Sequence, residues 1–86
     1  MNKEYWWLSF SDEKNLGIAI VEMPKGSHGI EAIKEAHRLG INPGGEVLHF
    51  LLETEEQIQE GKALGIGKLI PREEMIKKGY VSSGLE

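Results

Sequence analysis

The stretch from residue 5 to residue 10 reads YWWLSF and is almost wholly apolar or aromatic. Alternate side chains of a β-strand point to opposite faces of the sheet, so Trp6 and Leu8 lie on one face. Tyr5 and Trp7 then lie on the other. A strand with one face in water would alternate apolar and polar residues. This strand therefore has to be covered on both faces, which predicts a central position in a sheet.

The length and composition of the chain limit how such a strand can be covered. The chain has 86 residues and no cysteine, which fits a single domain without disulfides or thiolate metal sites. A domain this small relies on a well-packed core or on association with further chains. Its net charge of −4 argues against binding to duplex nucleic acid. We find no signal-peptide h-region and no apolar run of about 18 residues, so we expect a cytoplasmic protein without a membrane partner.

The pattern along the chain predicts one domain over residues 1–86, with elements in the order β-β-α-β-α-α and a flexible tail over residues 80–86. Gly40 is expected to end the first helix in the left-handed conformation, with Ile41 packing back on the last turn. Thr54 begins the second helix through a capping box with Gln57. The predicted elements span residues 5–10, 16–23, 30–39, 46–52, 54–61 and 72–78.

These elements predict an α+β fold with a small three-stranded, mostly antiparallel sheet. A short connection favours an antiparallel hairpin between the first two strands. The third strand can pair on the other side of the first, which gives the spatial order 2-1-3. One long helix, the first, is expected to cover one face of the sheet. We assign to that face the side chains of Trp6, Leu8, Phe10, Leu48, Phe50 and Leu52.

The opposite face also lacks the polar alternation of a solvated sheet, so it too must be covered. A bare patch of about 400 Å² would exceed what monomers usually tolerate. The C-terminal helices could cover it, but they offer few apolar residues. We therefore expect a second copy of the chain to cover this face, in a homo-oligomer. The side chains assigned to it are Tyr5, Trp7, Val47, His49 and Leu51.

Candidate ligand-binding residues lie in two glycine-containing loops. The loop over residues 24–29 follows a strand and opens a helix, where backbone N–H groups and the helix dipole favour an anion. The loop over residues 42–45 can form a similar nest of N–H groups. Ordinary structure explains both loops as well, through Ser27 as an N-cap and a type II turn. The candidate hydrogen-bond donors are Lys25, Gly26, Ser27, His28, Asn42, Gly44 and Gly45.

A stacking surface for a ligand is expected on the second face, from Tyr5, Trp7 and His49. His49 is either a packed interface histidine or a ligand contact beside a ring stacked on Trp7. The three histidines are separated by 9 and 12 residues, which matches no common zinc motif. No serine has the flanks of a nucleophile elbow. We therefore expect no catalytic residues, no metal site and no cofactor.

The combination of YWWLSF, LGIAIVE and LGINPGGEV resembles a family of small uncharacterised proteins from bacterial and phage genomes. The resemblance covers roughly residues 5–48, with a weaker match at KLIPREEM near the end. It implies no activity that transfers to this chain. A phage association would fit a small counter-defence protein that acts by binding.

The expected function is therefore binding and not catalysis. We expect a homo-oligomer that sequesters an anionic, nucleotide-like small molecule at a subunit junction. The alternative is a protein-binding inhibitor or adaptor that uses the apolar sheet face on a host protein.

Overall fold

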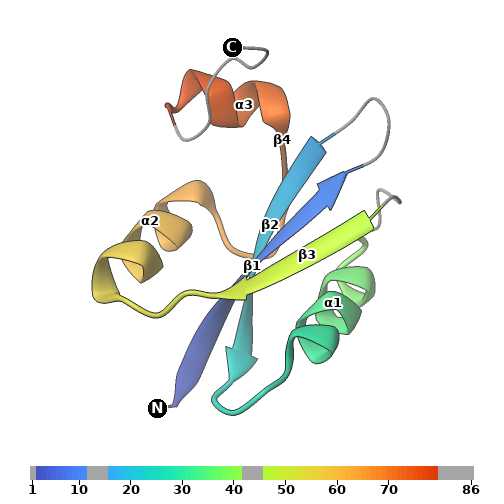
Figure 1. Cartoon of the computed structure of the whole chain (residues 1–86), viewed down its shortest axis with the longest axis vertical. Coiled ribbons are helices and arrows are strands. Elements are labelled where there is room, and N and C mark those ends of the chain that lie inside the picture. Colours follow the sequence, from blue (N-terminus) through green and yellow to red (C-terminus); the bar gives the residue numbers. More distant parts are fainter. Residues whose placement is uncertain (1, 12–15, 42–45, 80–86) are drawn as a thin grey trace.

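A computed structural model describes residues 2–11, 16–41 and 46–79 of the chain. The fold is α+β, with a four-stranded antiparallel sheet and three helices (Figure 1). The strands are β1 (Lys3–Ser11), β2 (Leu16–Pro24), β3 (Glu46–Leu51) and β4 (Leu69–Pro71), and the helices are α1 (Gly29–Arg38), α2 (Glu55–Leu64) and α3 (Arg72–Lys77).

The strands lie in the order β3-β1-β2-β4. The predicted order 2-1-3 is correct for the first three strands, and the Trp-rich β1 is central. The prediction of a three-stranded sheet is wrong, because β4 adds a fourth strand beside β2. β4 has only three residues and gives no alternating pattern in the sequence. It is recognisable only from its pairing, in which Ile70 lies opposite Ile18.

Helix α1 covers one face of the sheet and closes the larger core. It ends as predicted: Gly40 has a φ of 89°, and the N–H of Ile41 donates to the carbonyl oxygen of Ala36 at 2.8 Å, as in a Schellman motif. It begins differently, because the N-cap is His28, while the Ser27 hydroxyl donates to the carbonyl of Pro24. The buried core of this face comprises Leu8, Phe10, Ala19, Val21, Ala32, Ala36 and Ile41.

The assignment of β3 side chains to the two faces was wrong by one residue. The β1–β3 register sets Leu8 opposite His49 and Phe10 opposite Val47, and opposed residues share a face of the sheet. Val47 and His49 therefore lie on the α1 face, and Phe50 lies on the other. Both alternating sets of β3 are largely apolar, so a pattern of period two could not fix the choice.

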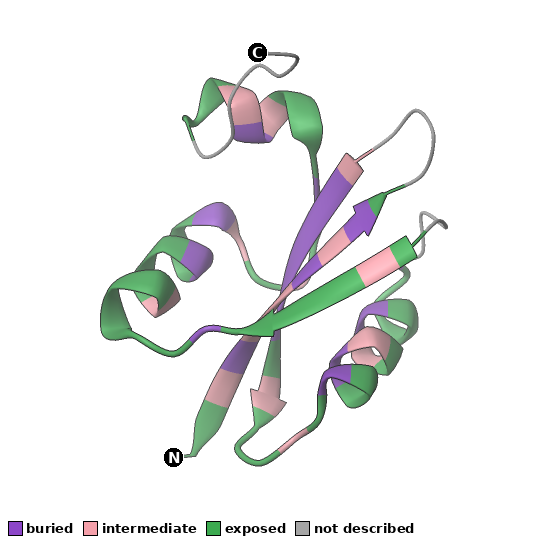
Figure 2. Ribbon diagram, in the orientation of Figure 1, coloured by how far each residue is buried: buried purple, intermediate pink, exposed green. Residues whose placement is uncertain are grey.

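Helices α2 and α3 cover the second face over β2 and β4, more fully than the sequence predicted. The sequence predicted that the second helix ends at Gly61, but α2 continues to Leu64. Gly61 is a glycine for another reason: it has no side chain and packs closely on Leu52 and Ile20. The coverage stops short of β3, which remains mostly exposed in Figure 2 while β2 is largely buried. The buried residues of this face are Tyr5, Ile18, Ile20, Leu52, Leu64, Ile70 and Met75.

Candidate ligand-binding site

The second face of the sheet is open along β3. Leu48 is 59% exposed and Phe50 is 53% exposed. Phe50 is paired in register with Trp7, which is half-buried between this open strip and the cores beneath α2 and α3. Exposed apolar residues that gather in one place commonly mark a binding surface. The strip formed by Trp7, Leu48 and Phe50 is therefore the candidate binding surface.

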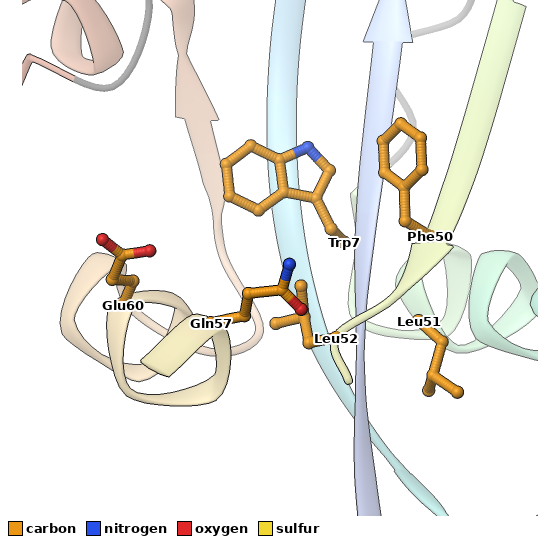
Figure 3. Close-up of a pocket in the computed structure, with 6 residues that line it drawn as sticks. All are labelled: Trp7, Phe50, Leu51, Leu52, Gln57 and Glu60. Atoms are coloured by element: carbon orange, nitrogen blue, oxygen red, sulfur yellow. The ribbon is translucent and has the colours of Figure 1, made fainter. Parts of the chain in front are cut away.

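A cleft of about 360 Å³ opens between this strip and α2. The rings of Trp7 and Phe50 lie on the same side of the sheet, and Gln57 and Glu60 come from α2 (Figure 3). Small-molecule pockets usually measure about 300–1,000 Å³, so the cleft has room for one ring system. Its lining residues are Trp7, Phe50, Leu51, Leu52, Gln57 and Glu60.

A complete capping box fixes the start of α2 and with it one wall of the cleft. The Thr54 hydroxyl oxygen accepts the N–H of Gln57 at 3.1 Å. The Gln57 amide oxygen in turn accepts the N–H of Glu53 at 2.9 Å. Because that oxygen is engaged at the cap, the amide nitrogen of Gln57 points toward the Trp7 ring (Figure 3). The cleft therefore offers two rings, an amide donor and the carboxylate of Glu60 as an acceptor.

A second hollow, of about 300 Å³, adjoins the cleft and shares Leu51 and Leu52 with it. The hollow differs from the cleft in its charged lining, because Lys3 and Lys25 lie in its wall. Lys25 is one of the donors predicted from the sequence. The hollow is lined by Asn2, Lys3, Glu4, Lys25, Leu51, Leu52, Glu53 and Ile58.

The glycine loop before α1 already holds a carboxylate of its own chain. The N–H of Gly26 donates to Oε1 of Glu4 at 3.0 Å, and Nε1 of Trp6 donates to Oε2 at 3.0 Å. The N–H of His28 donates to Glu31. An external anion in this loop would have to displace Glu4, so Gly26, Ser27 and His28 are engaged in local structure.

Tyr5 is a core residue and offers no open stacking surface. It is 9% exposed, and its hydroxyl donates to the carboxylate of Glu22 at 2.8 Å. This hydrogen bond, with burial and the negative charge of Glu22, raises the pKa of the Tyr5 phenol. The ammonium of Lys62 lies 5.1 Å from the centre of the ring, which is a cation–π distance.

His49 lies on the α1 face, away from the cleft. Its ring meets the Trp6 ring edge-on, with centroids 5.6 Å apart, and it lies against Gly29 at the start of α1. The predicted cluster of Tyr5, Trp7 and His49 therefore does not form, and of the three only Trp7 lines the cleft. The other candidates, Asn42, Gly44 and Gly45, lie outside the described residues.

Sequence reasoning missed Lys3, Phe50, Gln57 and Glu60 as site residues. Phe50 was assigned to the covered face because its parity was ambiguous. Gln57 was recognised only as part of the cap. One feature of the sequence does indicate the α2 wall. Gly61 allows a helix to approach the sheet closely, and Gln57 lies one turn before it on the same helix face.

Neither the protein families, nor the curated proteins, nor the solved structures compared with the chain give a match. Within the described residues, no group of three or more His, Asp or Glu side chains is arranged to hold a metal ion. No helix in the described ranges is both long enough and apolar enough to cross a membrane.

Proposed function

We propose that the protein acts by binding a small molecule that carries a planar ring and an anionic group, as a nucleotide does. The observation that carries the proposal is the pairing of an aromatic cleft with an adjoining hollow that contains two lysines. The ring would occupy the cleft beside Trp7 and Phe50. The anionic group would lie across Leu51 and Leu52, beside Lys3 and Lys25.

Charge decides this orientation of the ligand. Glu60 lines the cleft and would repel a phosphate placed there, whereas its carboxylate can accept a hydrogen bond from an exocyclic amine. The hollow contains two carboxylates beside its two lysines, those of Glu4 and Glu53. Glu4 already accepts hydrogen bonds from Gly26 and Trp6, which offsets part of its negative charge. Lys3 and Lys25 are then the groups best placed to meet an anion.

The chemistry of the site supports holding a ligand and not converting it. A ring between aromatic side chains gains about 1–3 kcal/mol from stacking, and lysines add a salt-dependent attraction. Sequestration of a nucleotide signal, as a counter-defence protein would perform it, is the biological role we propose for such a site.

A nucleotide panel tests the proposal. A ligand that binds only the native state raises the melting temperature through its free energy of binding, and titration calorimetry then gives Kd. Phe50→Ala, an exposed position, should weaken binding about 5- to 150-fold, which corresponds to the loss of about 1–3 kcal/mol of stacking. Lys25→Gln should weaken binding and reduce its salt dependence, while Lys34→Gln on the exposed surface of α1 serves as the matched control.

Two results would contradict the proposal. One is the absence of any melting shift with millimolar nucleotides. The other is a nucleotide whose affinity is unchanged by Phe50→Ala, which would place the ligand elsewhere.

The second candidate function, a host-protein inhibitor or adaptor, is favoured by the exposed apolar strand itself. It predicts that a partner protein, and no nucleotide, protects β3 amides from hydrogen exchange.

A further inference from the structure

The outer edge of β3 is the least protected edge of the described sheet. Proteins blunt free edges with short strands, lysine or proline, because unpaired N–H and C=O groups recruit further strands. The opposite edge, β4, has three residues and ends in Pro71. β3 has six residues, EVLHFL, with neither lysine nor proline, and only its β1 side is paired within the described chain.

One hydrogen bond shows which backbone groups of β3 face outward. The N–H of Leu52 donates to the carbonyl of Tyr5 at 2.9 Å, so residue 52 points its backbone groups toward β1. In an antiparallel pair, successive residues point these groups alternately toward the partner and away from it. Phe50 and Leu48 therefore bond to β1, while Val47, His49 and Leu51 present N–H and C=O groups to the outer edge.

We propose that two copies of this chain pair through β3 as antiparallel strands, with the two-fold axis at His49. In this register His49 lies opposite His49 of the second copy, and Val47 lies opposite Leu51. Every outward N–H and C=O from residue 47 to residue 51 then gains a partner. An axis at Leu48 or at Phe50 would set one of the three outward residues opposite a residue beyond β3, so the ladder within the strand would be incomplete.

The same register also pairs the exposed side chains. Leu48 lies opposite Phe50 of the second copy on the cleft face, so two apolar side chains that are each more than half exposed would cover one another. Glu46, the acidic residue of β3, falls opposite Leu52 and not opposite another carboxylate. Cross-strand apolar pairs stabilise a sheet, and like charges directly opposed destabilise it. The strand is therefore complementary to itself.

Helix α1 extends this surface on the other face of the sheet. Ile30 is 64% exposed and follows Gly29, which lies against the His49 ring. Leu39 lies near Gly67, a residue bonded to β2, so that flank of α1 faces away from β3. Nine residues separate Ile30 from Leu39, which is two and a half turns at about 3.6 residues per turn. Ile30 therefore projects from the opposite flank, toward the β3 edge and the proposed axis.

The area involved is in the range that a small dimer needs. Ile30, Leu48, Phe50 and Leu51 lie beside the β3 edge on the two faces of the sheet and are each at least 36% exposed. Together they expose on the order of 400 Å² of apolar surface, a size at which exposed patches often mark an interaction surface. A standard interface takes about 800 Å² from each partner. The pairing would also bury the outer backbone of β3 and the adjoining flank of α1, which add to the apolar area. A second copy would thus cover the exposed apolar side chains of β3 together with Ile30.

The dimer does not depend on the proposed ligand, but it would complete the ligand site. Leu48 of the second copy would lie beside Phe50, at the rim of the cleft. Each cleft would then be closed by the other subunit. Because the pairing can be measured without any ligand, its failure and the failure of the nucleotide proposal can be told apart.

The solution mass tests the pairing. Sedimentation of the wild-type chain should give twice the monomer mass of 9.6 kDa. Leu48→Glu places a carboxylate against Phe50 of the second copy and diagonally across the axis from its own counterpart, so this variant should be monomeric. Leu69→Glu makes the same change at the other sheet edge, at a leucine that is 40% exposed, and should remain dimeric. Circular dichroism verifies that each variant is folded.

Single cysteines test the register, since the chain has none of its own. Under mild oxidation His49→Cys should cross-link two chains, because directly opposed residues have Cα atoms about 5.5 Å apart, within disulfide range. Leu51→Cys, equally outward-facing, should cross-link far more slowly. A monomeric wild type, a dimer that survives Leu48→Glu, or faster cross-linking through residue 51 than through residue 49 would each overturn the proposal.

Discussion

The two faces of the sheet are similarly apolar in sequence but differ in how the chain covers them. On the α1 face, Leu8 and Val21 are fully buried beneath one ten-residue helix. On the opposite face, Ile20 is fully buried while Leu48 is 59% exposed, although two helices pack there. The number of covering helices therefore does not determine how complete the cover is.

The difference arises from where each helix is anchored. Helix α1 contacts β1, β2 and β3, whereas α2 contacts β1 and β2, and α3 contacts β2 and β4. The last two are tied to the β2–β4 side by Gly61 against Ile20 and by the core of Ile18 and Met75. The strip along β3 is left open as a result, and it is where the cleft and the proposed dimer edge both lie.

Truncating one leucine on each face should produce the largest difference in stability between the two faces. Leu8→Ala removes a fully buried side chain and should lower the free energy of unfolding by about 2–5 kcal/mol. Leu48→Ala, at an exposed position, should change it by about 0.5 kcal/mol or less. Urea unfolding of dilute protein measures both variants. Equal losses would mean that β3 is covered even in the isolated chain.

The sequence predicted the fold correctly wherever a local pattern of residues is compatible with only one structure. The central β1, the antiparallel hairpin partner and the end of α1 at Gly40 each follow from local chemistry, and each is present. The face to which each β3 side chain points was not predictable. One alternating set is Val47, His49 and Leu51, the other is Leu48, Phe50 and Leu52, and both are apolar enough to be the buried set. One residue of shift moved His49 to the α1 face and Phe50 to the cleft.

The candidate site was harder to predict than the fold, because it depends on contacts between distant segments. Lys3 and Lys25 are 22 positions apart and meet only through the β1–β2 register, which sets Lys3 opposite Pro24. The glycine loop was identified as an anion site on sound general grounds. No pattern in the sequence indicates that Glu4 fills that role from within the chain. Loop chemistry alone therefore does not separate an external ligand from an internal one.

A substitution at Gly61 tests how closely α2 must pack against the second face. A Cβ added there meets Cδ1 of Leu52 at 2.9 Å and Cγ2 of Ile20 at 3.5 Å. Gly61→Val should push α2 from the sheet and lower the free energy of unfolding by about 1–3 kcal/mol. Gly61→Ala is the matched control: the end of the Leu52 side chain can shift, and alanine is favoured over glycine within a helix by about 1 kcal/mol. We expect the alanine variant to be near neutral in thermal unfolding, and a loss as large as that of valine would show that α2 cannot adjust at all.

The smallest expected effect concerns the hydroxyl of Tyr5, a buried residue of the second face. The hydrogen bond to Glu22 raises the pKa of Tyr5 above its ordinary value of 10.0, so the folded state favours the protonated phenol. The stabilisation is therefore fully present below pH 10 and is lost as the pH rises through the raised pKa. Tyr5→Phe should lower the free energy of unfolding by about 0.5–1.5 kcal/mol near neutral pH, and this difference from wild type should shrink in alkaline solution. Tyr80→Phe, at the other tyrosine, controls for general alkaline effects. If the gap between wild type and Tyr5→Phe stays constant from neutral to strongly alkaline pH, the covered part of the second face is held by packing alone.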